Sequence, residues 1–363
     1  MCAVQTANSA KQYPLLESAP LYAQNLRLYS ALRHSIPVID AAIMKIVRLT
    51  GGFCVRCDDV YSQTMLDNLL EDINVNGTGR GIENFVSSYF EQLLTYGTAA
   101  GEIITDTSGY PYALYNAPLE NLELRRNANG IDVDIYSLTS GKAEKIKYPQ
   151  LVIISSLNPD PGALCGNSLL KGLPFVSEIL MKIFKTTGTN WDRLGNTRFA
   201  VTYKPANDTL DRAYAKERAM QVAKEWSNAM SSDSVKDFVA VGDIQIKVIG
   251  AETQIPDSEI PVRQLLEQII AKTGLPPFLL GLSWSSTERM SSQQADALTS
   301  ELEAYRRILT PAIKQLCSTC LRLMGLPDGC EVIWDDIMLQ DMVEIAQAEL
   351  YCAQAQNLTK EEK

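Results

Sequence analysis

IIAKTGLPPFLLGLSWSSTERMSS, residues 269–292, decides how the chain is organised, because it separates two amphipathic helices that the flanking sequence predicts. Apolar residues before it recur every three or four positions, and Gly274 followed by Pro276 and Pro277 predicts that the first helix ends there. Beyond it, apolar residues recur at the same spacing over 288–324. The stretch between is rich in serine, so we expect a connector with little regular structure.

Pro311 lies inside the second of these helical patterns. Proline lacks a backbone N–H and its ring clashes with the preceding turn, so we expect a kink at about 308–310. A helix over 288–324 would be roughly 55 Å long at about 1.5 Å per residue. The sequence therefore predicts a long, bent helix with one apolar side.

The composition is that of a folded chain. It has 363 residues, of which 46% are hydrophobic and 21% charged, enough to bury one large or two modest cores. No apolar run is long enough to span a membrane, and residues 1–15 lack the apolar core of a secretory signal. The net charge of −10 argues against tight binding of nucleic acid through phosphate neutralisation, although DNA could still slide past.

Enzyme chemistry finds little support. His34 is the only histidine, which leaves little room for a Ser–His or Cys–His pair, and we expect it to be exposed or to cap a helix. The glycines of 77–81 lack the spacing and the lysine of a phosphate-binding loop and predict a turn. Asp335 and Asp336, with Asp341 nearby, predict a solvated turn after a strand rather than a metal site.

Two CxxC pairs could in principle supply four zinc ligands. Cys54 and Cys57 lie in a predicted strand, where their side chains would point to opposite faces. Cys317 and Cys320 fall on the apolar side of the long helix, where we expect buried thiols. Eight cysteines without a signal peptide favour free thiols over disulfides, and no metal or other cofactor is expected.

The first half of the chain is predicted to be an α+β block. Helices are expected over 20–50 and 82–98, the second closed by Gly97. Short strands with hairpin-type turns at Ser108-Gly109 and Asn129-Gly130 favour antiparallel pairing; they are expected at 100–105, 113–115, 122–125, 133–138 and 151–155.

A helix over 173–194 follows, with a cationic face that carries Lys182 and Lys185 next to Glu178. An inserted unit over 198–256 comes next. Its expected elements are a strand at its start, a helix at 209–230, and strands at 237–241 and 244–249.

At this point the sequence resembles the portal proteins of tailed bacteriophages, over nearly the whole chain. The most specific segments are DFVAVGDIQIKVIG, then IPVRQLLEQIIAKTGLPPFLLGL, then SSQQADALTSELEAYRRILTPAIKQL. They match a closing strand pair of an inserted module, a helix before a Leu-Pro-Pro-x-Leu-Leu-Gly motif, and a long helix interrupted at proline. The motif residues here are Leu275, Pro276, Pro277, Leu280 and Gly281.

The resemblance implies a portal-type α+β fold. A mixed wing would comprise 1–172 and the kinked helix and returning strand of 294–338. Two stem helices, 173–196 and 257–275, would bracket a small α/β clip at 197–256, and 276–293 would be a tunnel loop. The final part, 339–363, would be a short helix, a reduced version of the crown that many portals carry.

The resemblance also implies a ring, usually of twelve subunits, at one capsid vertex, through which double-stranded DNA enters and leaves. DNA would face the tunnel loop at Ser283, Trp284, Ser285, Ser286, Thr287, Glu288 and Arg289, with Lys182 and Lys185 as candidate channel cations. Serine hydroxyls would offer neutral hydrogen bonds without trapping phosphate. A solvated or intersubunit position is the competing interpretation of the cations, and anchoring of the loop that of Trp284.

The implied partners are the terminase large subunit, the head–tail adaptor, the major capsid and scaffolding proteins, and no membrane. The protein would be assembled in the host cytoplasm and end in the virion, without enzymatic activity. Two other classes stay open: an assembly adaptor without a DNA channel, and a zinc- or thiol-dependent enzyme.

Overall fold

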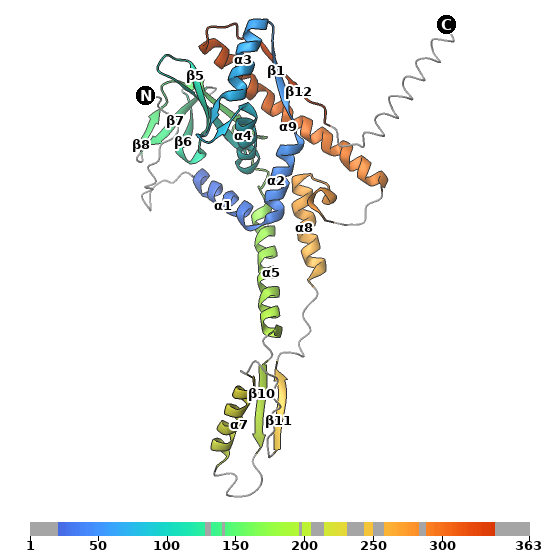
Figure 1. The fold of residues 1–363 in the computed structure, drawn as a ribbon. Helices are drawn as coiled ribbons and strands as arrows, with labels where there is room; N and C mark the ends of the chain where they lie inside the picture. Colours follow the sequence, from blue (N-terminus) through green and yellow to red (C-terminus); the bar gives the residue numbers. More distant parts are fainter. Residues whose placement is uncertain are drawn as a thin grey trace, which may run out of the picture. The chain divides into compact units, whose positions relative to one another are not determined.

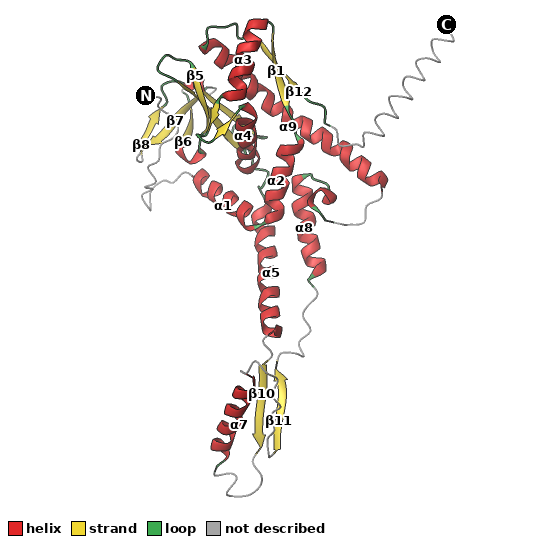
Figure 2. Ribbon diagram, viewed as in Figure 1, coloured by secondary structure: helices red, strands yellow, loops and turns green. Residues whose placement is uncertain are grey.

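Strands and helices of this protein form two compact units, which a computed structural model describes over residues 21–127, 132–139, 142–195, 198–204, 214–230, 243–249, 258–282 and 288–337. Unit 1 comprises Met1–Ser177 and Leu265–Lys363, and unit 2 comprises Glu178–Gln264. The chain thus leaves unit 1 once and returns to it. Figures 1 and 2 show the mixture of helices and strands that the sequence predicts.

The core of unit 1 is a five-stranded sheet with α4 (Ile82–Tyr96) packed on it. The strand order is β3-β2-β5-β4-β9, with β2 parallel to β5 and the other pairs antiparallel. The strands are β2 (Asn74–Val75), β3 (Gly79–Arg80), β4 (Thr98–Thr105), β5 (Pro111–Asn116) and β9 (Val152–Ser156). A glycine is needed at Gly101, because a Cβ there would lie 2.4 Å from the Phe85 ring.

The step from α4 into β4 depends on Gly97. It caps the helix in the left-handed region, with φ of 80°, and its N–H donates to the Leu93 carbonyl. Gln92 secures the same corner, because its side chain accepts from the Ala100 N–H and donates to the Ala117 carbonyl. The helix and its glycine end therefore lie where the sequence predicts them.

Two helices begin the described chain, α1 (Leu21–Ser35) and α2 (Pro37–Leu49), and Pro37 at the first position of α2 separates them. Leu26 of α1 joins an apolar cluster around the sheet, while α2 buries Ile39, Ala42, Ile43 and Ile46. The helical structure expected over 20–50 is thus present as a pair of helices.

Smaller elements complete the first half. The sheet β6-β7-β8 is antiparallel and consists of β6 (Leu122–Arg126), β7 (Val133–Thr139) and β8 (Lys142–Lys145). Single 3-10 turns occur at Leu119–Asn121 and Pro149–Leu151. The turn at Ser108-Gly109 follows the prediction, with Gly109 at φ of 87°; Asn129-Gly130 lies outside the described residues.

A third sheet of unit 1 joins distant parts of the chain. β1 (Phe53–Cys57) pairs antiparallel with β12 (Cys330–Trp334), and the two strands lie side by side in Figure 1. The long helix α9 (Glu288–Leu323) packs against β12, β9 and α3 (Val60–Asp72). Asp59 caps α3 by accepting a hydrogen bond from the Ser62 N–H.

Unit 2 contains most of α5 (Leu173–Gly195) and an antiparallel pair formed by β10 (Arg198–Lys204) and β11 (Asp243–Ile249). Helix α7 (Ala215–Met230) packs on β10. The predicted strand at 237–241 and the predicted helix near residue 340 lie outside the described residues. Helix α8 (Glu259–Thr273) begins in unit 2 and ends in unit 1.

Among the described residues, no helix is long and apolar enough to span a membrane.

Candidate functional site

The segment after α8 is an ordered turn at its start. Thr273 ends the helix, Gly274 follows with φ of 70°, and Leu275 is buried at 1% exposure. Pro277 opens the 3-10 helix η3 (Pro277–Leu280), which Gly281 closes in the left-handed region with φ of 75°. The motif therefore shapes the backbone together with the residue before it: Gly274 and the motif residue Gly281 supply conformations that other residues rarely adopt, and the two motif prolines stop the helix.

This turn is held by backbone hydrogen bonds and packing. The Gly281 N–H donates to the Phe278 carbonyl and the Leu282 N–H to the Pro277 carbonyl, both at 3.1 Å. Helix α2 contacts η3. Within the expected tunnel loop over 276–293, η3 occupies the start and α9 begins at Glu288, while its assignment as a tunnel loop stays a prediction.

The predicted DNA-facing residues divide into two groups. Glu288 and Arg289 belong to the first turn of α9, which begins where the helical pattern over 288–324 predicts it, and their DNA-facing role stays a prediction. A helix can begin there because no proline follows until Pro311. The other five, Ser283, Trp284, Ser285, Ser286 and Thr287, lie outside the described residues.

The candidate cations Lys182 and Lys185 are both exposed on α5, three residues apart. The Lys182 ammonium lies 2.7 Å from the Glu178 carboxylate, and this hydrogen bond lowers the pKa of Glu178. Both partners of the ion pair are more than half exposed. A surface pair of this kind stabilises a helix only slightly, but it offsets the charge of Lys182.

Helix α9 runs without interruption through Pro311. The neighbouring Thr310 is tied twice: its hydroxyl donates to the Arg306 carbonyl at 2.7 Å and accepts from the Trp334 indole N–H at 2.9 Å. The expected kink at Pro311 stays a prediction. The bonds at Thr310 couple the proline region to the returning strand β12.

Arg306 contacts the end of α2 and strand β12, and the sequence pattern does not single it out. It is 9% exposed, and its Nε and Nη2 donate to the Thr50 carbonyl at 2.8 and 2.5 Å. Its guanidinium lies 5.1 Å from the centroid of the Trp334 ring. Burial lowers the pKa of Arg306, opposed by the nearby carboxylates, first Asp335. Gly51 makes room, since a Cβ there would lie 2.9 Å from Nη2.

The first CxxC pair lies in strand β1 and the second in helix α9, as predicted. Cys54 is exposed, whereas Cys57 is half-buried and lies directly opposite Cys330, a pairing that no local sequence pattern predicts. Cys317 and Cys320 are buried in α9, as expected. Burial raises the pKa of Cys317, and the nearby Cys320, Cys330 and Cys57 thiols raise it further.

The described residues hold no group of three or more histidine, cysteine, aspartate and glutamate side chains arranged to bind a metal ion. His34 is exposed in the last turn of α1, where its Nδ1 lies 2.7 Å from the Ser30 carbonyl. Asp335 and Asp336 are exposed after β12, and 76–78 form the turn between β2 and β3. The exposure expected of His34, Asp335 and Asp336 is confirmed, and the turn expected over 77–81 is confirmed for 77 and 78 alone; Asp341 lies outside the described residues.

No protein-family model and no curated protein matches the chain. Solved structures do. A chain in the virion of a native gene transfer agent particle matches 94% of this chain and 90% of its own length, with 14% identity and a TM-score of 0.64. A chain in the neck of a native gene transfer agent particle, computed with C12 symmetry, matches 92% and 88%, with 16% identity and a TM-score of 0.63.

An HK97 family phage portal protein from Corynebacterium diphtheriae also matches, over 84% of this chain and 93% of its own, with 12% identity and a TM-score of 0.44. The two gene transfer agent chains establish that this α+β fold is shared, nearly end to end, with components of such particles.

Proposed function

We propose that the protein is the portal subunit of a phage or gene transfer agent particle, which forms a ring at one capsid vertex and gives DNA its route in and out. The observation that carries the proposal is the shared fold with a chain of a particle neck that was computed with C12 symmetry, over 92% of this chain. A neck joins head to tail, so a ring with an open centre suits that position.

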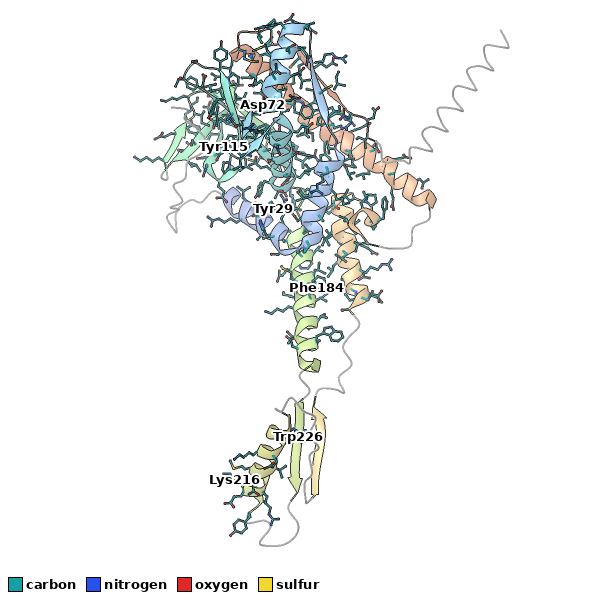
Figure 3. The ribbon with its side chains drawn as sticks, in the orientation of Figure 1. Tyr29, Asp72, Tyr115, Phe184, Lys216 and Trp226 are labelled. Carbon is teal, nitrogen blue, oxygen red and sulfur yellow. The ribbon has the colours of Figure 1, made fainter. Side chains whose placement is uncertain are left out.

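An exposed apolar stripe on α5 supports the ring. Met181, Phe184 and Trp191 lie at spacings of three, four and three when Gly188 is included, so they share one side of the helix. They are 41%, 55% and 64% exposed, and Figure 3 labels Phe184 on α5. Water-exposed apolar side chains in a row mark a surface that a partner covers. In a ring, the covering surface comes from the next copy.

On this proposal the chain divides into wing (1–172 and 294–338), stem (173–196 and 257–275), clip (197–256), tunnel loop and reduced crown (339–363). The clip would dock the terminase large subunit during packaging and the head–tail adaptor afterwards, and the wing would contact capsid and scaffolding proteins. The particle would be assembled in the host cytoplasm.

The channel would hold DNA loosely. The net charge of −10 disfavours tight phosphate binding, and the Glu178 carboxylate offsets one of the two candidate channel lysines. In the tunnel loop, 276–293, the serine hydroxyls and Trp284 would face the duplex. Loose contact suits a duplex that must move.

Negative-stain imaging of the purified chain tests the ring. We expect closed rings with a central hole wide enough for duplex DNA, whose major groove alone is about 12 Å wide. Monomers, or open filaments, under all assembly conditions would contradict the proposal. Closed rings without such a hole would favour an adaptor that forms no DNA channel.

A paired substitution tests the α5 stripe. Phe184→Glu places a charge on the apolar side and is expected to shift the population from rings to monomers in size-exclusion chromatography with light scattering. Thr186→Glu adds the same charge to an exposed position of the opposite side of the helix and is expected to leave rings intact. Equal loss of rings in both variants would remove the stripe from the interface.

Deletion of 283–292 tests the tunnel role. Rings are expected to form, because the deleted residues precede the core contacts of α9, while DNA packaging into particles falls. Normal packaging by the deletion variant would sink the proposed role of this segment.

A further inference from the structure

Cys57 and Cys330 are directly opposite each other at the end of the β1–β12 ladder, so their side chains share one face of the sheet. The Asp335 N–H donates to the Gly52 carbonyl at 3.0 Å, which makes that pair a hydrogen-bonded one. Because hydrogen-bonded and non-hydrogen-bonded pairs alternate along an antiparallel ladder, the cysteine pair is of the second kind. The Cys57 N–H agrees with this, since it donates to Gln63 Oε1 at 2.7 Å.

That register suits a disulfide. Opposed residues in a non-hydrogen-bonded pair have Cα atoms about 4.5 Å apart, inside the range of roughly 4.4–6.8 Å found in disulfides. Both residues are free thiols in this structure. The Cys330 thiol lies 3.9 Å from the Lys314 carbonyl and 3.4 Å from the Ser318 hydroxyl. Closing the bond therefore requires the Cys330 side chain to turn from α9 toward its opposite residue.

We propose that Cys57 and Cys330 are a modification site that a small disulfide, such as oxidised glutathione, converts to a cross-strand disulfide. The Cys57 thiolate attacks one sulfur of oxidised glutathione, breaking its S–S bond and releasing one glutathione thiolate. The Cys330 thiolate then attacks the Cys57 sulfur of the mixed disulfide and releases the second. Two protein thiols are oxidised, one small disulfide is reduced, and the two protons end on the released glutathione molecules.

Exposure sets the order of attack. Cys57 is half-buried and reachable, whereas Cys330 is 8% exposed. Burial raises the pKa of Cys57, and Cys330 and the carboxylates of the neighbouring aspartates raise it further, so the first step is expected to be faster at alkaline pH. Cys317 and Cys320 are fully buried and stay out of the exchange.

The bond would close a loop from β1 to β12 that contains all of unit 2 and α9. A cross-link over so long a loop removes many conformations of the unfolded chain, which favours the folded state. A stabilising role of this disulfide rests on the proposed function, in which a particle subunit folds in a reducing cytoplasm and acts after release into an oxidising medium.

Peptide mapping of the full chain tests the site. The reduced protein is incubated with oxidised glutathione at pH 8.5 and digested without reductant. We expect a cross-linked peptide joining Cys57 to Cys330 that is two hydrogens lighter than the two reduced peptides. We also expect the thermal midpoint to rise by about 5 °C or more and to fall back with dithiothreitol. Cys54 is exposed in the same strand, and we expect it to carry a glutathione adduct rather than to enter the cross-link.

Variants separate the pair from general thiol reactivity. Cys330→Ser is expected to trap glutathione on Cys57 and to abolish the thermal shift, whereas the control Cys54→Ser keeps both the cross-link and the shift. A Cys54 adduct without any cross-link would overturn the proposal, as would a cross-link from Cys57 to Cys317. Either result leaves ring formation untouched, so it is distinguishable from failure of the proposed function.

Discussion

The Arg306 side chain joins helix α9 to the end of α2 and to strand β12. Its guanidinium donates two hydrogen bonds to the Thr50 carbonyl, the C-cap of α2, where the helix dipole favours positive charge. It also lies against the Trp334 ring of β12. One buried cation thus connects α9 with the end of α2 and with the returning strand. Removing it would leave a buried carbonyl without this donor.

We expect Arg306→Ala to lower the free energy of unfolding by about 2–4 kcal/mol, because a buried charge-assisted pair of hydrogen bonds and a ring contact are lost together. Urea denaturation followed by circular dichroism measures the change. Arg307→Ala is the matched control: this arginine is exposed on the same helix, and its loss is expected to cost less than about 0.5 kcal/mol. Equal costs for the two variants would contradict the role assigned to Arg306.

At the scale of elements, α4 and α9 meet through aromatic rings. Phe90 and Tyr305 have centroids 5.4 Å apart, and the neighbouring Tyr89 is buried and donates a hydrogen bond to the Ser155 hydroxyl at 2.8 Å. Burial raises the pKa of Tyr305 to about 12, with Glu301 adding to the effect, and burial raises that of Tyr89 as well. Neither phenol ionises readily while the two helices are packed.

This packing predicts alkaline sensitivity. Below pH 10 both tyrosines are neutral in the folded and in the unfolded chain, so their burial adds no pH dependence to the free energy of unfolding. Above pH 10 the unfolded chain loses protons that the folded chain keeps, so stability falls as pH rises toward 12, by at most about 1.4 kcal/mol per pH unit for each tyrosine. Tyr305→Phe is expected to reduce this slope in urea unfolding at pH 9–11.5. The exposed Tyr61→Phe control should not; an unchanged slope in Tyr305→Phe would refute the assignment.

Elements with strong local signals could be predicted from sequence, and pairings between distant segments could not. The end of α8, the span of α9 and the Gly97 cap follow from periodicity and glycine. Helix α3 was missed because its buried positions include Ser62, although Asp59 was an available cap signal. Charged side chains obscured β8.

The candidate site divides the same way. The motif from Leu275 to Gly281 could be found because glycine and proline dictate local backbone. The Cys57–Cys330 register and the Arg306 contact with Thr50 join residues more than two hundred positions apart, and no local pattern encodes such contacts. From the sequence alone, Arg306 cannot be told apart from the other charged residues on the surface of a helix.

At the scale of the whole molecule, unit 2 is an insertion in the sequence of unit 1. The three described sheets of unit 1, and the contacts of α9 with β9 and β12, are made by residues of unit 1 alone. The core of unit 1 is therefore expected to form without the inserted residues.

Replacing 178–264 with a flexible Gly/Ser linker of about 15 residues tests this independence. We expect a single cooperative unfolding transition and the same cost for Arg306→Ala as in the full chain, because distant sites contribute additively. A non-cooperative transition, or a cost that differs by more than about 1 kcal/mol, would show that unit 1 needs unit 2.

The β1–β12 pairing has a consequence for synthesis. Strand β1 emerges from the ribosome early, but its only partner in the described sheet begins at Cys330. At about 5–20 residues per second, the wait from residue 57 to residue 330 lasts roughly 15–55 s. Throughout that time β1 has two open edges, each able to pair with another nascent chain. Crowded polysomes should therefore endanger this protein more than dilute refolding does.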